Sequence, residues 1–209
     1  MFKQRNNLFK KSMLISTIVA GSLLFGTTWA EAKTVEVNKV NATAVSTSTK
    51  TVATSVSKKG VLTLPKNFKT STVKNELKPE AAKLIKIYGG SLKDGKTTTF
   101  NSYVNKHVAP HTKTDYLLGH QYTKDDYSKK VKGTRKVNSK DSISKYSKAV
   151  MKVTTSKVKN SYAHKGDGWA NFSYDFQPEN YSPMNTVTIY FRFTQLKNGQ
   201  YVLENIHYY

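Results

Sequence analysis

The chain of 209 residues contains no cysteine, and this absence excludes several kinds of chemistry. Disulfide bonds, attachment of a lipid to a cysteine, thiolate catalysis and zinc sites built on cysteine sulfur all require a residue that the chain does not have. If the chain is exported, its hydrophobic core alone must therefore stabilise the folded state.

Arginine and acidic residues are also scarce. The 34 basic residues include only three arginines and face 13 acidic residues, which gives a formal net charge of +21. Such a charge attracts polyanions: wall teichoic acids, anionic lipid head groups, nucleic acids or acidic polysaccharides. Because lysine is a point charge whereas arginine makes bidentate phosphate contacts, the composition predicts diffuse electrostatic attachment. The alternative is a solubilising charge on a solvated surface.

Long apolar runs are absent except near the start of the chain. Four basic residues precede the apolar run from Met13 to Phe25, and Ala30-Glu31-Ala32 follows with small residues at both positions that a signal peptidase reads. This pattern predicts a secretory signal peptide over residues 1–32. The run is shorter than the roughly 20 residues of a membrane-spanning anchor, which is the alternative. Cleavage would leave a secreted chain with a formal charge of +18 and no integral membrane segment.

Residues 33–76 are dominated by threonine, serine, valine and lysine, with almost no large apolar residue before Leu62. Such a segment cannot bury enough apolar surface to offset the entropy lost on ordering, so it is predicted to be a flexible linker. Leu62, Leu64 and Phe68 are expected on the surface of the domain that follows. Residues 77–209 differ in composition and are long enough for a domain with its own core.

The first half of this domain shows helical periodicity. Pro79 suits a first helical turn, and apolar residues then recur at helical spacing up to Leu92. A second helix is expected over residues 94–110, where a proline ends it. A third, short helix is expected over residues 123–133, from a capping-box-like pair to a glycine.

The second half changes toward a period of two after about residue 143. Residues 150–163 are predicted to form one lysine-rich strand or two short ones, and residues 169–176 to form another. The chain closes with a hairpin over residues 186–209, where Asn198-Gly199 is a strong signal for a two-residue turn. Helices followed by an antiparallel meander predict an α+β domain with N-terminal helices packed on the sheet.

The turn position sets the pairing of the closing hairpin. A two-residue turn would place Phe191 opposite Ile206, Ile189 opposite Tyr208, Arg192 opposite Asn205 and Tyr190 opposite His207. The first two pairs share an apolar face that is expected in the core. The other face is amphipathic, with Tyr190, Arg192, Tyr201, Leu203, Asn205 and His207. Aromatic and polar side chains of this kind line ligand pockets, so Tyr190, Arg192, Asn205 and His207 are candidate binding residues. The alternatives are a homodimer interface or ordinary cross-strand pairs on a solvated face.

The closing strand and the order of elements resemble those of a known superfamily. Gly199, Tyr201, Leu203 and His207 match a turn glycine, an aromatic residue, an aliphatic residue and a late histidine in the last strand of NTF2-like (cystatin-like cone) proteins. The resemblance covers residues 77–209 and implies helices packed on a curved antiparallel sheet. Tyr201 stands where tryptophan is commoner, and the Asp–His pairs of catalytic members have no clear counterpart. The superfamily holds isomerases, dehydratases and non-enzymatic envelope modules, and fold alone does not choose among them.

Trp169 is a further candidate binding residue. It opens a predicted strand that also carries Tyr174 and follows several lysines. Aromatic side chains interleaved with lysine bind single-stranded nucleic acid or sugars, and a wall polymer or sugar is the more accessible partner for an exported chain. The alternative is that both aromatics pack in the core beside a solvated basic strand.

Motifs for catalysis or metal binding are missing. His107 and His111 are four residues apart, but Pro110 between them indicates the end of a helix and not a metal site. The pair Asp125-Asp126 is better explained by helix capping than by paired catalytic carboxylates. No phosphate loop, nucleophile elbow or zinc-protease motif occurs. We therefore predict no catalytic residues, metal or cofactor.

These observations favour one function and leave two alternatives open. The leading hypothesis is a secreted, strongly basic, non-enzymatic module held at the bacterial cell envelope by anionic polymers. One alternative is a small-molecule-binding or isomerase-like protein with Tyr190, Arg192 and His207 in its pocket. The other is an extracellular nucleic-acid binder.

Overall fold

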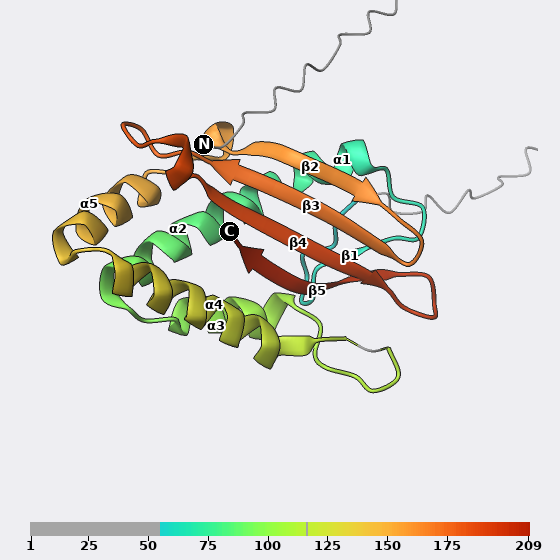
Figure 1. Cartoon of the computed structure of the whole chain (residues 1–209). Helices are drawn as coiled ribbons and strands as arrows, with labels where there is room; N and C mark the ends of the chain where they lie inside the picture. Colours follow the sequence, from blue (N-terminus) through green and yellow to red (C-terminus); the bar gives the residue numbers. More distant parts are fainter. Residues whose placement is uncertain (1–54, 116) are drawn as a thin grey trace, which may run out of the picture. The chain divides into compact units, whose positions relative to one another are not determined.

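The computed structural model describes residues 55–115 and 117–209 of the chain. This part is an α+β domain, as predicted, with five α-helices and a curled sheet of five antiparallel strands (Figure 1). The predicted signal peptide and residues 33–54 of the predicted linker lie outside the described residues. Among the described residues, none of the helices has the length and apolar character needed to span a bilayer.

The sheet has one short edge strand and four long strands. Its order is β1 (Thr63–Leu64), β5 (Tyr201–Tyr208), β4 (Val187–Gln195), β3 (Trp169–Phe176) and β2 (Lys159–Lys165). Every neighbouring pair is antiparallel. Strands β2 to β5 therefore form a continuous meander, and the first strand of the chain pairs with the last.

The helices come from the first two thirds of the described chain. They are α1 (Thr70–Glu76), α2 (Lys78–Asp94), α3 (Thr98–His107), α4 (Gly119–Val137) and α5 (Lys140–Met151). Helix α2 contacts β3 and β4 in the middle of the sheet. Helix α4 packs along β5, near the edge of the sheet that β1 forms (Figure 1). Helix α4 thus covers the part of β5 that the two-residue strand β1 leaves unpaired, which protects an exposed strand edge.

Two helices differ from the prediction. Helix α4 continues through Gly133, because this residue has no positive φ and faces open space, so nothing ends the helix there. Helix α5 lies where the sequence pattern predicts a change toward strands. Its buried residues Ile143, Ser147 and Val150 have helical spacing, and the Ser139 side chain caps it by accepting a hydrogen bond from the Ser142 backbone N–H.

The predicted linker boundary is wrong for the residues nearest the domain. Leu62, Leu64, Phe68 and Val73 are all buried in the main core cluster. The Leu203 N–H donates to the Leu62 carbonyl at 2.9 Å, so this segment also completes the backbone pairing of β5. Average composition concealed this role because a few well-spaced apolar residues are enough to anchor a segment that is otherwise polar.

The closing hairpin has the predicted inner register but a different turn. Phe191 pairs with Ile206 and Tyr190 with His207, as predicted, and the other two predicted pairs are also present. The loop, however, has three residues, since Leu196 donates to the Gln200 carbonyl and Gly199 lies at φ 84°. An extra residue at Glu204 forms a bulge that restores the register. The bulge also turns Tyr201 and Leu203 into the core, so their predicted place on the amphipathic face is wrong.

Buried tyrosines give the domain a predictable response to alkaline pH. Burial raises the pKa of five core tyrosines above the usual value: Tyr88, Tyr103, Tyr127, Tyr174 and Tyr208. In the unfolded chain tyrosine ionises near pH 10, so stability is complete below about pH 10 and falls as the pH rises beyond it.

We therefore expect the melting temperature followed by circular dichroism to fall steeply between pH 10 and pH 12. Because lysines lose charge over the same range, the specific readout is tyrosinate absorbance. Absorbance from the five buried tyrosines should appear together with unfolding. Complete tyrosine ionisation in a protein that keeps its folded spectrum would contradict this expectation.

Candidate functional site

The predicted residues Asn205 and His207 lie in a hydrogen-bonded network between β5 and α4. The Asn205 side-chain oxygen accepts hydrogen bonds from the Ile206 backbone N–H at 2.7 Å and from the Thr123 hydroxyl at 2.8 Å. Since a backbone N–H can only donate, this contact fixes the orientation of the amide. The Asn205 Nδ2 group must then donate to His207 Nε2, which lies 2.7 Å away.

The orientation of Asn205 in turn fixes the tautomer of His207. Nε2 is the acceptor, so Nδ1 carries the proton and donates to Asp126 Oδ2 at 3.0 Å. Both ring nitrogens are engaged within the protein. This network ties α4 to β5 and leaves His207 no nitrogen with which to take a proton from a substrate.

The Asp126 contact corrects the sequence-based interpretation. The sequence predicts a capping role for Asp126 and no Asp–His pair, but Asp126 lies inside α4 and pairs with His207. Thr123 and Asp126 are three residues apart on one side of this helix, and Asn205 and His207 are two apart on β5. These matched spacings are a signal that could have revealed the network.

Arg192 is committed to a buried carboxylate. Its Nε atom lies 3.0 Å from Glu204 Oε2, and the Glu204 side chain is only 5% exposed. Glu204 also accepts hydrogen bonds from the Thr194 hydroxyl and, at 3.4 Å, from the Leu118 backbone N–H. A buried carboxylate needs such a partner. The charge of Arg192 therefore stabilises Glu204 in the fold, and an anionic ligand would have to compete with Glu204 for it.

Tyr190 belongs to an aromatic cluster around His207. The rings of Tyr122, Tyr190 and Tyr209 have centroids 6.2, 6.3 and 6.3 Å from that of His207. Tyr122 and Tyr209 are exposed, so this cluster is partly open to solvent. The structure therefore brings Tyr190, Arg192, Asn205 and His207 together on one face of β4 and β5.

Trp169 lies at the other end of the sheet. It pairs with Thr194, whereas Tyr190 pairs with Ser173, which places the two aromatics four residues apart along the strands, about 13 Å. The Trp169 ring packs on the turn glycine Gly166, where an added Cβ would lie 2.3 Å from the indole. Trp169 thus contacts the β2–β3 turn and is not part of the His207 cluster.

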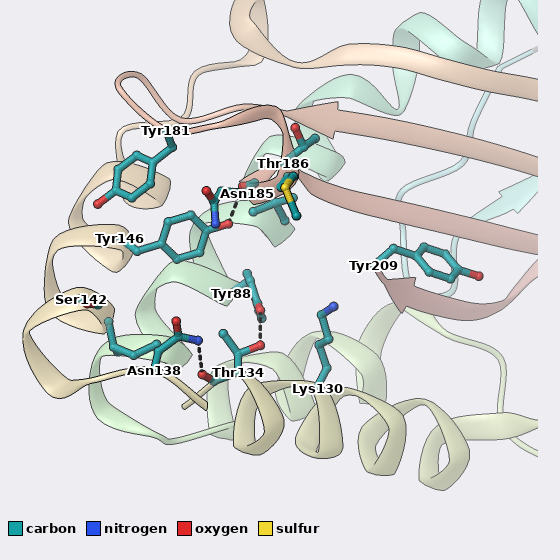
Figure 2. Close-up of a pocket in the computed structure, with 13 residues that line it drawn as sticks. Tyr88, Lys130, Thr134, Asn138, Ser142, Tyr146, Tyr181, Asn185, Thr186 and Tyr209 are labelled. Atoms are coloured by element: carbon teal, nitrogen blue, oxygen red, sulfur yellow. Dashed lines mark hydrogen bonds between the residues drawn. The ribbon is translucent and has the colours of Figure 1, made fainter. Parts of the chain in front are cut away.

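A pocket lies between α4, α5 and the segment that leads into β4 (Figure 2). Its volume is about 340 Å³. Its walls come from Tyr88, Lys130, Thr134, Asn138, Ser142, Ile143, Tyr146, Tyr181, Met184, Asn185, Thr186, Val187 and Tyr209. The sequence does not reveal this site, because its residues are spread over more than 120 positions and form no local motif. Tyr209 joins the pocket to the aromatic cluster around His207.

Hydrogen bonds hold the walls of the pocket in place. The Tyr88 and Thr134 hydroxyls lie 3.0 Å apart, and the Tyr146 hydroxyl donates to the Asn185 carbonyl at 2.7 Å (Figure 2). Burial raises the pKa of both Tyr88 and Tyr146, so their hydroxyls stay neutral. Lys130 is the only charged side chain among the lining residues, and none of the lining side chains is a carboxylate.

The histidines near the end of α3 occupy separate structural positions. His107 Nδ1 lies 2.9 Å from the Gly60 carbonyl, and burial lowers its pKa. His111 Nδ1 contacts the Leu117 carbonyl at 2.6 Å. Within residues 55–115 and 117–209, no group of three or more His, Asp or Glu side chains could hold a metal ion.

Comparison of the chain with protein-family models, with curated proteins and with solved structures finds no match. The site is therefore interpreted from its geometry and charge alone.

Proposed function

We propose that the protein is a secreted, non-enzymatic binding module that is held at the bacterial cell envelope by anionic polymers. We also propose that its α+β domain is an NTF2-like cone. The observation that carries the functional proposal is an excess of positive charge without internal partners. Residues 55–209 contain 27 basic and 11 acidic residues. In the described part of the chain only Lys145, Lys157 and Arg192 form lysine or arginine ion pairs.

The lysines of α4 and α5 are arranged in two matching rows. Lys129, Lys132 and Lys136 are exposed on α4 at intervals of three and four residues, which places them on one side of the helix. Lys145, Lys148 and Lys152 repeat this spacing on and just after α5, where Lys145 also pairs with Asp141. No carboxylate interrupts the sequence between Asp126 and Asp141. Such a surface attracts a flexible polyanion without reading its sequence.

The engaged nitrogens of His207 support a non-catalytic function over the isomerase-like alternative. In that alternative His207 would act as a base, yet its Nδ1 and Nε2 atoms already contact Asp126 and Asn205. A base needs a nitrogen within hydrogen-bond reach of the proton that it removes.

Binding to cell walls should depend strongly on salt. We expect the affinity of residues 33–209 for isolated walls that contain teichoic acids to fall at least about tenfold between 50 and 200 mM salt, as for three or more neutralised phosphates. Removal of the teichoic acids should have the same effect. Cosedimentation measures both changes. Binding that is indifferent to salt would refute the electrostatic mechanism.

A matched pair of triple variants locates the binding surface. Replacement of Lys129, Lys132 and Lys136 by glutamine should weaken binding more than replacement of the exposed Lys58, Lys59 and Lys197, although both variants lose three charges. Equal losses would mean that net charge acts without a defined surface. Tighter binding of single-stranded DNA than of teichoic acid in the same assay would instead favour the nucleic-acid alternative.

A further inference from the structure

The pocket between α4 and α5 has the composition of a ligand site and not of an incidental gap. Four tyrosines (Tyr88, Tyr146, Tyr181 and Tyr209) contribute to its walls, together with hydroxyl and amide side chains. Its volume of about 340 Å³ lies within the range of small-ligand pockets, roughly 300–1,000 Å³. Aromatic walls with a few convergent polar groups are the usual form of such sites.

The single charge of the pocket defines one part of its ligand. Lys130 extends from α4 toward the pocket (Figure 2). It is half-buried, and within the described residues no carboxylate forms an ion pair with it. The Lys130 ammonium group forms no ion pair in the described part of the chain, and the lining has no acidic side chain, so this position favours an anionic group of a ligand. Lysine binds phosphate as a point charge.

The remaining walls define the other part of the ligand. Tyr209 is 65% exposed and Met184 is 94% exposed at the rim, so apolar surface is available to cover the carbon face of a small molecule. Asn138 and Ser142 add amide and hydroxyl groups. Tyr146 and Tyr181 meet at an interplanar angle of 67° and form no parallel slot for a planar base. A non-planar polyol or sugar fits this arrangement better than a nucleobase.

We propose that this pocket binds one phosphate-bearing polyol or sugar unit, with the phosphate on Lys130 and the carbon skeleton against Tyr209. The inference rests on the proposed function: the lysine rows bind the wall polymer, and the pocket binds one repeat unit of that polymer. The same chemistry occurs in a free sugar phosphate and in a repeat within a wall polymer. Short and polymeric probes separate these two sources.

The test compares variants that differ only in their relation to the pocket. Lys130→Gln is matched by Lys124→Gln, which removes the same charge from another half-buried position of α4, outside both the lining and the lysine rows. Tyr209→Ala is matched by Tyr122→Ala, another exposed tyrosine outside the lining. Binding of glycerol 3-phosphate, glucose 1-phosphate and a glycerol-phosphate oligomer is measured by NMR titration in moderate salt, with inorganic phosphate and glucose as reference probes.

We expect Lys130→Gln and Tyr209→Ala to weaken binding of the phosphorylated probes at least tenfold, and the two matched variants to change it less than twofold. Equal effects of Lys130→Gln and Lys124→Gln would overturn the pocket assignment. Inorganic phosphate binding as tightly as the organic phosphates would overturn the polyol or sugar part. Uridine monophosphate serves as a nucleotide probe. If it binds more tightly than glycerol 3-phosphate and glucose 1-phosphate, the assignment of the ligand as a polyol or sugar phosphate is overturned.

Whole-wall binding separates this inference from the proposed function. If walls bind in low salt but Lys130→Gln and Lys124→Gln behave alike toward the short probes, only the pocket assignment fails. If walls do not bind at any salt concentration, the proposed function fails, whatever the short probes do. Oligomer binding that exceeds monomer binding and depends on Lys130 identifies the polymer as the source; equal binding identifies the free phosphate.

Discussion

A protein that begins at residue 77 is expected not to fold, whereas a protein that begins at residue 55 should fold as the longer chain does. The shorter protein lacks Leu62, Leu64, Phe68 and Val73, all of which are buried in the core. Burial of such side chains contributes about 1.5–3 kcal/mol each, or about 6–12 kcal/mol together. This loss is comparable with the whole stability of a typical domain, about 5–15 kcal/mol.

The truncation also removes contacts that no other segment can replace. Tyr174 donates its hydroxyl to the Lys74 carbonyl at 2.8 Å, and the Leu203 N–H loses the Leu62 carbonyl. Circular dichroism and amide NMR dispersion of the two proteins measure the difference. A cooperative thermal transition in the protein that starts at residue 77 would show that the core is complete without the β1–α1 segment.

Replacement of Asn205 by alanine should be among the most damaging single changes on the sheet. Asn205 is fully buried and serves three partners: the Thr123 hydroxyl, the Ile206 N–H and His207 Nε2. The substitution leaves the buried Ile206 N–H without this partner and takes the donor from His207 Nε2. It leaves the Thr123 hydroxyl only the Gly119 carbonyl at 3.3 Å. An unsatisfied buried group costs about 1–3 kcal/mol. We expect the free energy of unfolding to fall by about 3 kcal/mol or more, measured by urea denaturation.

Asn67→Ala is the control for this change. Asn67 is exposed, so its replacement should alter the free energy of unfolding by no more than about 0.5 kcal/mol. The Asn205 variant should also change the NMR signals of His207, because its Nε2 atom loses its donor. A loss below about 1 kcal/mol for Asn205→Ala would mean that water or a rearranged side chain satisfies the network.

The sequence was most informative where the pattern was regular and local. The helical spacing before Leu92, the turn before Trp169 and the alternation around Phe191 each gave the right element. Local patterns failed where tertiary contacts decide the outcome. The α5 region is rich in lysine on its solvent side, so its helical spacing depends on only a few apolar residues. The composition of residues 62–76 predicts a linker, since the partners that bury this segment lie far away in sequence.

The candidate sites were predictable to different degrees. The cross-strand pairs of the hairpin followed from counting residues, and the spacing of apolar residues at 201, 203, 206 and 208 contained the signal of the bulge. The partners of His207 and Arg192 could not be counted in the same way. Asp126 is 81 positions from His207 in sequence, and only the packing of α4 against β5 brings them together. The pocket depends wholly on such long-range packing.

The hairpin loop has one residue more than the predicted turn, and the bulge at Glu204 compensates for this extra residue. Insertions and deletions at these two positions are therefore coupled. Deletion of a loop residue alone would push Tyr201 and Leu203 out of the core or shift the pairing of His207. Loss of one residue at each position would preserve the inner pairs. Related chains should therefore differ at both positions together, and an alignment that places a single gap between Leu196 and Asn205 would misassign the strand that carries the network.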